Sequence, residues 1–327
     1  MRRPIFTSIL RRPEFGALAA FVVTYIFFAI VTNGAGFVSL NGTLGWLNLA
    51  AELGIVAIPV GILMIAGEFD LSVGSTVGAA SMIVAVGTQY FGLPIWPMIA
   101  LALLAGGLVG LINGLIVVRT DLPSFIVTLA TNFTVIGATM GVSRLIANVT
   151  SMSIASSPSA HFAFAARWGQ ANMSIFWWVV VALFAGLVLG RTTFGNWIYA
   201  TGGNLPAARG AGVPVERVKV VLFVSAGVAA AFIGVLQGVE WNSGNSTYGQ
   251  GYVFQAPIVA VIGGVLLGGG YGSVIGIFLG TAIFGVISTG IFYTGWSTDW
   301  IQLFLGCLLG AAVLANSYVR RFALSVR

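Results

Sequence analysis

The sequence predicts an all-α polytopic membrane protein with about ten transmembrane helices, some of them broken at glycine-rich motifs. Hydrophobic residues make up 58% of the 327 positions and charged residues only 7%, whereas a soluble domain carries about 25% charged residues. The mean hydropathy is +1.02. The chain also has 45 glycines, which suit helices that pack closely, because small residues let backbones approach. Most of the protein's surface is therefore expected to be in contact with lipid.

Crossing about 30 Å of hydrocarbon takes about 20 apolar helical residues. Segments of that kind follow one another along the whole chain. The first is expected to be retained as a span, because its apolar run is long and shows no small-residue cleavage site. The expected spans begin near Phe15, Gly45, Leu71, Trp96, Ser124, Met173, Val218, Gln255, Ser273 and Asp299.

The basic residues predict the orientation of the chain. An even number of spans puts both termini on one side, and cytoplasmic segments carry an excess of Lys and Arg. With both termini in the cytoplasm, only Arg144 and Arg167 of the 14 basic residues fall outside. The net charge of +6 therefore indicates orientation, and no nucleic-acid partner is expected. The twelve inner residues are Arg2, Arg3, Arg11, Arg12, Arg119, Arg191, Arg209, Arg217, Lys219, Arg320, Arg321 and Arg327.

Two polar segments interrupt the spans. The outer one, residues 146–171, contains the single histidine, His161, which is expected to be a surface residue. The inner one, about 191–219, includes PAARGAG, in which Pro206 can start a short helix that Gly210 or Gly212 would end. A short helix between glycines suits a groove in a partner subunit. The alternative is a solvated loop.

The chemistry of an enzyme is missing. The single lysine, Lys219, does not follow a glycine loop, so the chain lacks the Walker A motif of a P-loop ATPase. One histidine and one cysteine, Cys307, leave no metal cluster, internal disulfide or catalytic triad. No enzyme activity, cofactor or metal is expected. Glycines at four-residue spacing are interpreted as helix-packing faces: Gly106, Gly110 and Gly114; Gly272, Gly276 and Gly280; Gly306 and Gly310.

Two acids, Glu68 and Asp70, lie in the apolar stretch LMIAGEFDLSVGSTVGAA. A charge at the bilayer centre costs about 2.5–3.5 kcal/mol on insertion scales, so both need a reason. One interpretation is that Gly67 permits a helix break, Asp70 is the N-cap of the next span and Glu68 reaches the cytoplasmic surface. The other is that the break lines a substrate pathway, where irregular backbone is tolerated.

Further polar residues within the spans extend this second interpretation. Thr128 and Asn132 are four residues apart and share a helix face, so they suit either interhelical hydrogen bonds or the pathway. The candidate pathway residues are Glu68, Asp70, Ser72, Thr128 and Asn132.

Three stretches resemble the permease subunits of ribose-type bacterial sugar ABC importers. They are GEFDLSVGS, IYATGGNLPAARGAGVPVERVK and GYVFQAPIVAVIGGVLLGGGYGSVIG, in the family's order and over most of the chain. Three departures from the family pattern bear on the identity of the sugar: Glu68 replaces a glycine, Leu205 and Pro206 stand where acids are frequent, and Val253 and Gln255 replace polar or acidic positions.

The resemblance implies a single permease domain over residues 1–327, multi-pass in the bacterial inner membrane, which imports a monosaccharide or related polyol. It implies a cytoplasmic ATP-binding subunit, a second permease copy or paralogue, and a periplasmic sugar-binding protein. The positions that match the ATPase-coupling loop of the family are Gly203, Asn204, Ala207, Ala208, Arg209 and Gly212. Two alternatives are an ion-coupled secondary sugar transporter that uses Glu68 and Asp70, and a membrane scaffold that transports nothing. The inner loop favours the importer, because an ion-coupled carrier needs no docking helix.

Overall fold

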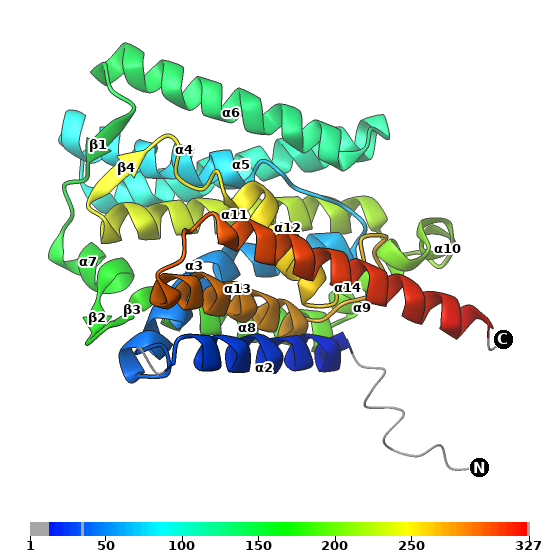
Figure 1. Ribbon diagram of the computed structural model, residues 1–327. Helices are drawn as coiled ribbons and strands as arrows, with labels where there is room; N and C mark the ends of the chain where they lie inside the picture. The colour runs from blue at the N-terminus through cyan, green and yellow to red at the C-terminus, as the bar shows by residue number, and fades with distance from the viewer. Residues whose placement is uncertain (1–12, 34–35, 326–327) are drawn as a thin grey trace. The chain divides into compact units, whose positions relative to one another are not determined.

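The structure, a computed structural model, describes residues 13–33 and 36–325 and is mainly helical (Figure 1). The helices of the first half are α2 (Pro13–Val31), α3 (Leu40–Ile65), α4 (Val73–Ala85), the π-helix η1 (Val86–Tyr90), α5 (Ile95–Thr120) and α6 (Ser124–Ala147). The middle of the chain forms β1 (Ser151–Ser153), α7 (Pro158–Ala165), β2 (Arg167–Trp168), β3 (Ala171–Asn172), α8 (Met173–Arg191), α9 (Thr193–Gly203) and α10 (Leu205–Gly210). The remaining elements are α11 (Val215–Glu240), β4 (Ser243–Asn245), α12 (Tyr252–Ile262), α13 (Val274–Thr294) and α14 (Trp300–Ser325).

The helical membrane character predicted from the sequence is confirmed. Seven helices in the described ranges are long and apolar enough to cross a membrane, namely α2, α3, α5, α6, α8, α11 and α13. All ten predicted segments coincide with helices, and the largest difference in starting point is five residues (Gly45 predicted, Leu40 observed). However, α12 has only 11 residues, which cover about 16 Å, and α4 has 13 before the chain continues as the five-residue π-helix η1. Ten full-length spans are therefore not confirmed.

Five of the basic residues behind the predicted orientation lie outside the described residues: Arg2, Arg3, Arg11, Arg12 and Arg327. The cytoplasmic placement of both termini stays a prediction.

The chain divides into two compact units, and the first comprises residues 1–67, 178–203 and 256–327. Helices α3 and α13 are mostly buried and pack against each other. A β-carbon at Gly276 or Gly280 would collide with the backbone of α12 or of the residue that follows it. The predicted packing face of α13 is thus confirmed. Gly306 and Gly310 have nothing within 4 Å of a β-carbon position, so the same prediction is wrong for that pair within this unit.

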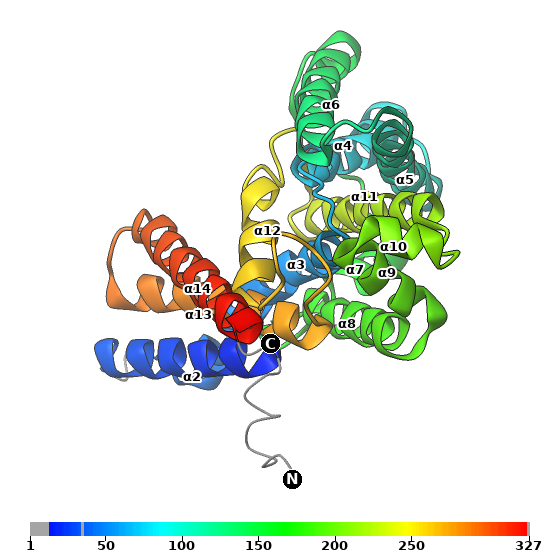
Figure 2. The ribbon, with the colours of Figure 1, turned by 90° about the vertical axis from the view of Figure 1, so that its right-hand side faces the viewer.

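The second unit comprises residues 68–177 and 204–255. Helix α11 packs along α5 and α4, and Figure 2 shows these three helices next to one another. A β-carbon at Gly106 or Gly110 would collide with backbone carbonyls of α11, which confirms the predicted packing face of α5. Close approach of the two backbones explains why these positions hold glycine.

The predicted outer loop is partly ordered into short strands and a helix. Strand β1 pairs with β4 in antiparallel register, with Ser151 opposite Asn245, and β2 and β3 form a hairpin. His161 is exposed on α7, as expected of a surface residue. In Figure 1, β1 and β4 lie at the end of α11 that is remote from α10.

Candidate functional site

The predicted helix break lies between α3 and α4. Gly67 follows the end of α3 with a φ of +89°, a left-handed conformation that glycine adopts without steric cost. The acids that follow it are both buried, Asp70 at 0% and Glu68 at 8% exposure. The break is confirmed, and the acids lie in the irregular backbone between the two helices.

Asp70 binds the start of α4, although not from the predicted position. Its Oδ1 accepts hydrogen bonds from the backbone N–H of Ser72 at 2.9 Å and from the Ser72 hydroxyl at 2.6 Å. The N-cap residue is Ser72, so the prediction that Asp70 is the N-cap is wrong. Ser72 has helical dihedral angles, φ −80° and ψ −9°, so the acid two positions earlier forms an Asx turn and still satisfies a free N–H there.

One face of α6 supplies further acceptors for the same backbone. Three side chains, spaced four residues apart and therefore on one helix face, bind N–H groups of the break and of the first turn of α4. Ser124 accepts from Phe69 at 3.0 Å, Thr128 from Leu71 at 3.0 Å, and Asn132 from Ser75 at 3.2 Å. The predicted shared face of Thr128 and Asn132 is confirmed, and its hydrogen bonds join two helices.

A second chain of hydrogen bonds ties α5 to the same place. Thr131 donates to Asn113 at 2.7 Å, Asn113 donates to the Ser72 hydroxyl at 2.9 Å, and that hydroxyl donates to Asp70. The start of α4 is thus held by polar side chains from α5 and α6. The second oxygen of Asp70, Oδ2, is buried and has no hydrogen-bond partner.

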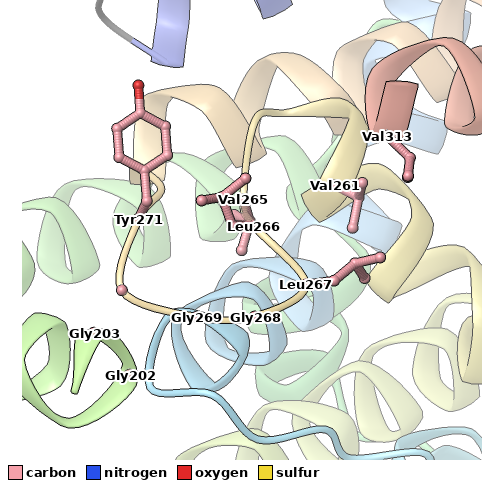
Figure 3. A pocket seen from close by; sticks show the side chains of 11 residues that line it. Gly202, Gly203, Val261, Val265, Leu266, Leu267, Gly268, Gly269, Tyr271 and Val313 are labelled. Carbon is pink, nitrogen blue, oxygen red and sulfur yellow. The ribbon is translucent and has the colours of Figure 1, made fainter. Parts of the chain in front are cut away.

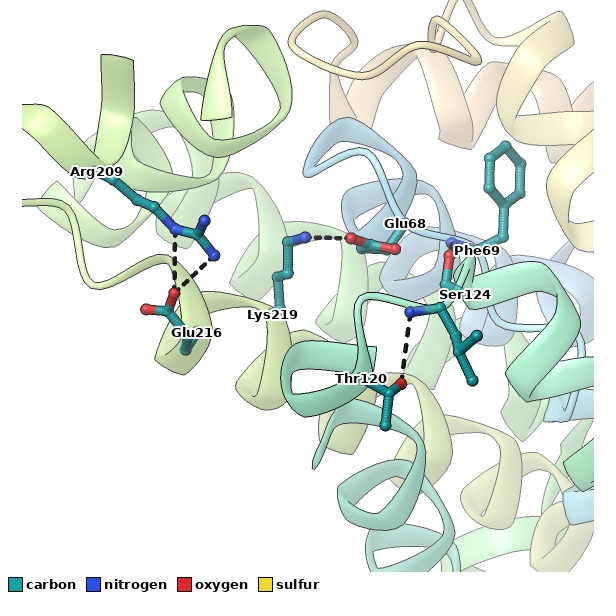
Figure 4. A network of polar contacts seen from close by, with 8 residues as sticks. Glu68, Phe69, Thr120, Ser124, Arg209, Glu216 and Lys219 are labelled. Carbon is teal, nitrogen blue, oxygen red and sulfur yellow. Dashed lines mark hydrogen bonds and ion pairs between the residues drawn. The ribbon is translucent and has the colours of Figure 1, made fainter. Parts of the chain in front are cut away.

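Glu68 forms an ion pair with Lys219, the single lysine of the chain, from the second turn of α11 (Figure 4). The Glu68 and Lys219 side chains are only 11% and 14% exposed. The carboxylate of Glu68 turns to a cation that lies 151 positions further along the sequence. The expectation that Glu68 reaches the cytoplasmic surface stays a prediction.

The inner segment, about 191–219, is mostly helical. It forms α9 and α10, and α10 begins one residue before Pro206 and ends at Gly210. The side chain of Asn204 accepts from the N–H of Ala207 at 3.0 Å, which makes it an N-cap. Gly212 follows with a φ of +78°. The predicted short helix is confirmed. Of the six candidate coupling residues, Ala208 is buried, and Gly203, Asn204, Ala207, Arg209 and Gly212 are exposed.

Arg209 is tied to the first turn of α11. Its guanidinium donates from Nε at 3.2 Å and from Nη2 at 2.9 Å to one oxygen of Glu216 (Figure 4). Both side chains are 53% exposed, so solvent screens this pair and it contributes at most about 1 kcal/mol. The pair links α10 to the first turn of α11.

The first unit contains a cavity of about 320 Å³ beside the loop between α12 and α13 (Figure 3). Gly270 in this loop donates to the Ile65 carbonyl at the end of α3 at 2.7 Å, and Tyr199 donates to the Gly272 carbonyl at 2.8 Å. The lining consists of glycines, aliphatic side chains and Tyr271. The cavity thus offers no carboxylate, imidazole or thiol, and the wider described part of the chain has no group of three potential metal-binding side chains.

Comparison with known proteins decides what this helical scaffold is. Residues 42–313 match the family described as the permease component of branched-chain amino acid transport systems. The chain belongs to this permease family. No solved structure matches it.

Several curated relatives are similar to the permease over nearly its whole length. The probable ABC transporter permease protein YphD of Escherichia coli (strain K12) is 32% identical, covering 93% of this chain and 89% of its own. The fructose import permease protein FrcC of Rhizobium meliloti is 30% identical, covering 94% and 86%. The L-arabinose transport system permease protein AraH of Escherichia coli (strain K12) is 32% identical, covering 94% and 92%.

The permease is therefore a membrane subunit of an ATP-binding cassette importer, and it is not an enzyme. ATP hydrolysis belongs to a separate subunit, in agreement with the missing Walker A motif. These relatives support the importer over the ion-coupled carrier.

The partner of Glu68 was not predicted from the sequence. The ion pair joins residues from distant parts of the chain, and no local spacing predicts it. One signal was present, because a nearly uncharged membrane chain with a lone lysine and an acid in an apolar stretch has reason to pair them. Glu240 was also missed: its carboxylate, at the end of α11, contacts Arg167 at 3.4 Å and Asn172 at 2.5 Å.

Proposed function

We propose that the permease imports a monosaccharide or a related polyol into a bacterial cytoplasm. One observation carries this proposal: relatives at 30% and 32% identity that span nearly the whole chain are named for fructose and L-arabinose. A neutral sugar also fits a protein in which 7% of residues are charged, because hydroxyl groups need hydrogen-bonding partners and no counter-ion. The substrate would be bound weakly here, with affinity supplied by a soluble binding protein.

The proposed complex follows from the family. Two permeases, identical or paralogous, form the pathway in the inner membrane, with a cytoplasmic ATP-binding subunit and a periplasmic sugar-binding protein. In this proposal the permease is a single domain with ten membrane-embedded helical segments and both termini in the cytoplasm. The short helices α4 and α12 are two of these ten segments.

The segment 191–219 is the proposed coupling loop. Asn204, Ala207 and Arg209 are exposed on or beside α10, and Gly203 and Gly212 flank it, so these residues are available to an ATP-binding subunit. Ala208 is buried and would hold α10 in place without touching the partner. The side chain of Asn204 caps the start of this helix, and the Arg209–Glu216 pair links the helix to α11.

The break before α4 is the proposed inner end of the pathway. Five residues lie around it in the second unit: Glu68, Asp70, Ser72, Thr128 and Asn132. Their hydrogen bonds and ion pair support a positioning role, because each is directed at backbone or at another protein side chain. In this proposal they hold the start of α4, and substrate passes along the backbone that they fix.

The test is sugar uptake by vesicles that contain the permease and its ATP-binding subunit, with the binding protein also present in the assay. Partners are first recovered by mild-detergent pull-down from native membranes and identified by mass spectrometry. Labelled fructose, L-arabinose, xylose and galactose are then offered singly. We expect uptake of at least one sugar that requires ATP and is insensitive to an uncoupler.

The matched control is the same vesicle with an ATP-binding subunit whose Walker A lysine is replaced, which should take up no sugar. Uptake that persists with this inactive subunit and collapses with an uncoupler would reject the importer. ATP-dependent uptake of an amino acid and of no sugar would reject the proposed substrate class alone.

A further inference from the structure

Four charged side chains of alternating sign run from α10 to the helix break. Arg209 on α10 pairs with Glu216 on α11, and Lys219, also on α11, pairs with Glu68 before α4. Glu216 and Lys219 are three residues apart, and residues at this spacing are neighbours on a helix surface. Figure 4 shows the two ion pairs following one another along the start of α11.

The Glu68–Lys219 pair lies where burial makes a charged side chain costly. Glu68 and Lys219 are mostly buried, in contrast to the half-exposed Arg209 and Glu216. A buried pair seldom adds net stability over apolar residues of the same size, but loss of one partner is severe because it leaves an unpaired buried charge. Opening this pair is therefore costly, and the two residues are expected to move together.

The residues that follow Glu68 are bound just as closely. The N–H of Phe69 donates to Ser124 and that of Leu71 donates to Thr128, so the break is fixed to α6 within three residues of the ion pair. A displacement of Lys219 would pass through Glu68 into this backbone and so to the start of α4. The contacts are contiguous from α10 to α4, and all of them lie in the second unit.

We infer that the Glu68–Lys219 pair is a strut that transmits movement of α10 and the start of α11 to the start of α4. Glu68 and Lys219 are positioning residues: neither contacts ATP, and neither is required to touch the sugar. This inference rests on the proposed coupling role of the segment 191–219. It adds a specific link between that segment and the inner end of the pathway, and it gives a purpose to the acid at position 68.

The experiment measures sugar uptake per ATP hydrolysed in reconstituted vesicles. Glu68→Lys and Lys219→Glu each place two like charges together, and the double variant restores an ion pair with reversed polarity. We expect each single variant to lower the ratio of uptake to hydrolysis at least about tenfold, because it leaves two like charges buried together. The double variant should recover to within about threefold of the unmodified chain, since contacting residues are not additive.

Three further variants separate a strut from a merely structural residue. Lys219→Arg keeps the charge and should keep the ratio, whereas Glu68→Gln keeps the shape and should lower it. Arg119→Glu reverses an exposed charge at the end of α5 and should leave the ratio unchanged. Assembly with the ATP-binding subunit is measured for every variant by co-purification.

Each outcome decides. Single variants that transport with a normal ratio overturn the strut. If the single variants fail to assemble with the ATP-binding subunit, and the double variant assembles but does not recover the ratio of uptake to hydrolysis, the pair is structural. That result also overturns the strut. An unmodified chain that does not hydrolyse ATP with its partner, or takes up no sugar, is a failure of the proposed function instead, because the ratio is then undefined for every variant.

Discussion

Replacing Thr128 by valine tests whether α6 holds the start of α4. Valine has nearly the same shape as threonine but no hydroxyl, so the N–H of Leu71 loses its acceptor at 3.0 Å and the carbonyl of Ser124 loses a donor at 2.8 Å. Thr128 is fully buried, and an unsatisfied buried donor costs about 1–3 kcal/mol. Leu71 is only partly buried, which favours the lower half of that range.

The matched control is Thr134→Val on the same helix. Thr134 is exposed and its hydroxyl bonds only the Ala130 carbonyl of its own helix, at 2.9 Å. This change should alter the free energy of unfolding by less than about 0.5 kcal/mol, as is usual for surface positions. Both variants are unfolded with SDS in mixed micelles and followed by tryptophan fluorescence.

A Thr128→Val variant as stable as Thr134→Val would refute the reasoning that the hydroxyl is needed by the backbone of the break. Sugar uptake measured on the same preparations adds a second result. Loss of uptake with unchanged stability would assign Thr128 to contact with the substrate.

Three other changes follow from the same structure. Asp70→Asn should keep uptake and change the unfolding free energy by no more than about 1 kcal/mol, because an amide oxygen also accepts from a helix N–H; complete loss of uptake in a stable protein would contradict this. Arg209→Glu should leave stability within about 1 kcal/mol, since the pair is exposed, but abolish ATP-driven uptake; normal uptake would exclude docking through α10, and recovery with Glu216→Arg added would show that the pair itself is what matters. Gly110→Ala should destabilise the protein by about 1–3 kcal/mol because of overpacking against α11, with Gly137→Ala, where a β-carbon meets nothing, as the control; equal SDS midpoints for the two would argue against close α5–α11 packing.

The sequence predicted helices and their local geometry better than contacts. Gly67 and the two acids predicted a helix break, because glycine permits a break and a charge is costly in lipid. The spacing of Thr128 and Asn132 predicted a shared face, because the helical period is regular. The helix from Pro206 was foreseen from turn and cap residues alone. In each case the deciding interaction lies within a few residues of the chain.

Predictions failed where the answer depended on distant residues or on the exact end of a helix. Asp70 was expected at the N-cap, but the helical conformation of Ser72 moved that position by two residues. Gly306 and Gly310 have the spacing of a packing face, yet no neighbour in their unit approaches them. The segment of α12 was expected to be a full span, but the helix ends after 11 residues although the apolar run continues, because hydropathy does not mark where helical hydrogen bonding stops.

Because of the contacts between α6 and the break, some positions should accept many more substitutions than others. The side chains of Ser124, Thr128 and Asn132 bind the backbone of the α4 start, and a backbone N–H is common to every residue except proline. A saturation scan should therefore accept many side chains at Phe69, reject proline there, and accept few at Thr128. Because the side chain of one partner in each contact is free to vary, the surface beside the proposed pathway can be altered for a different substrate without loss of these contacts.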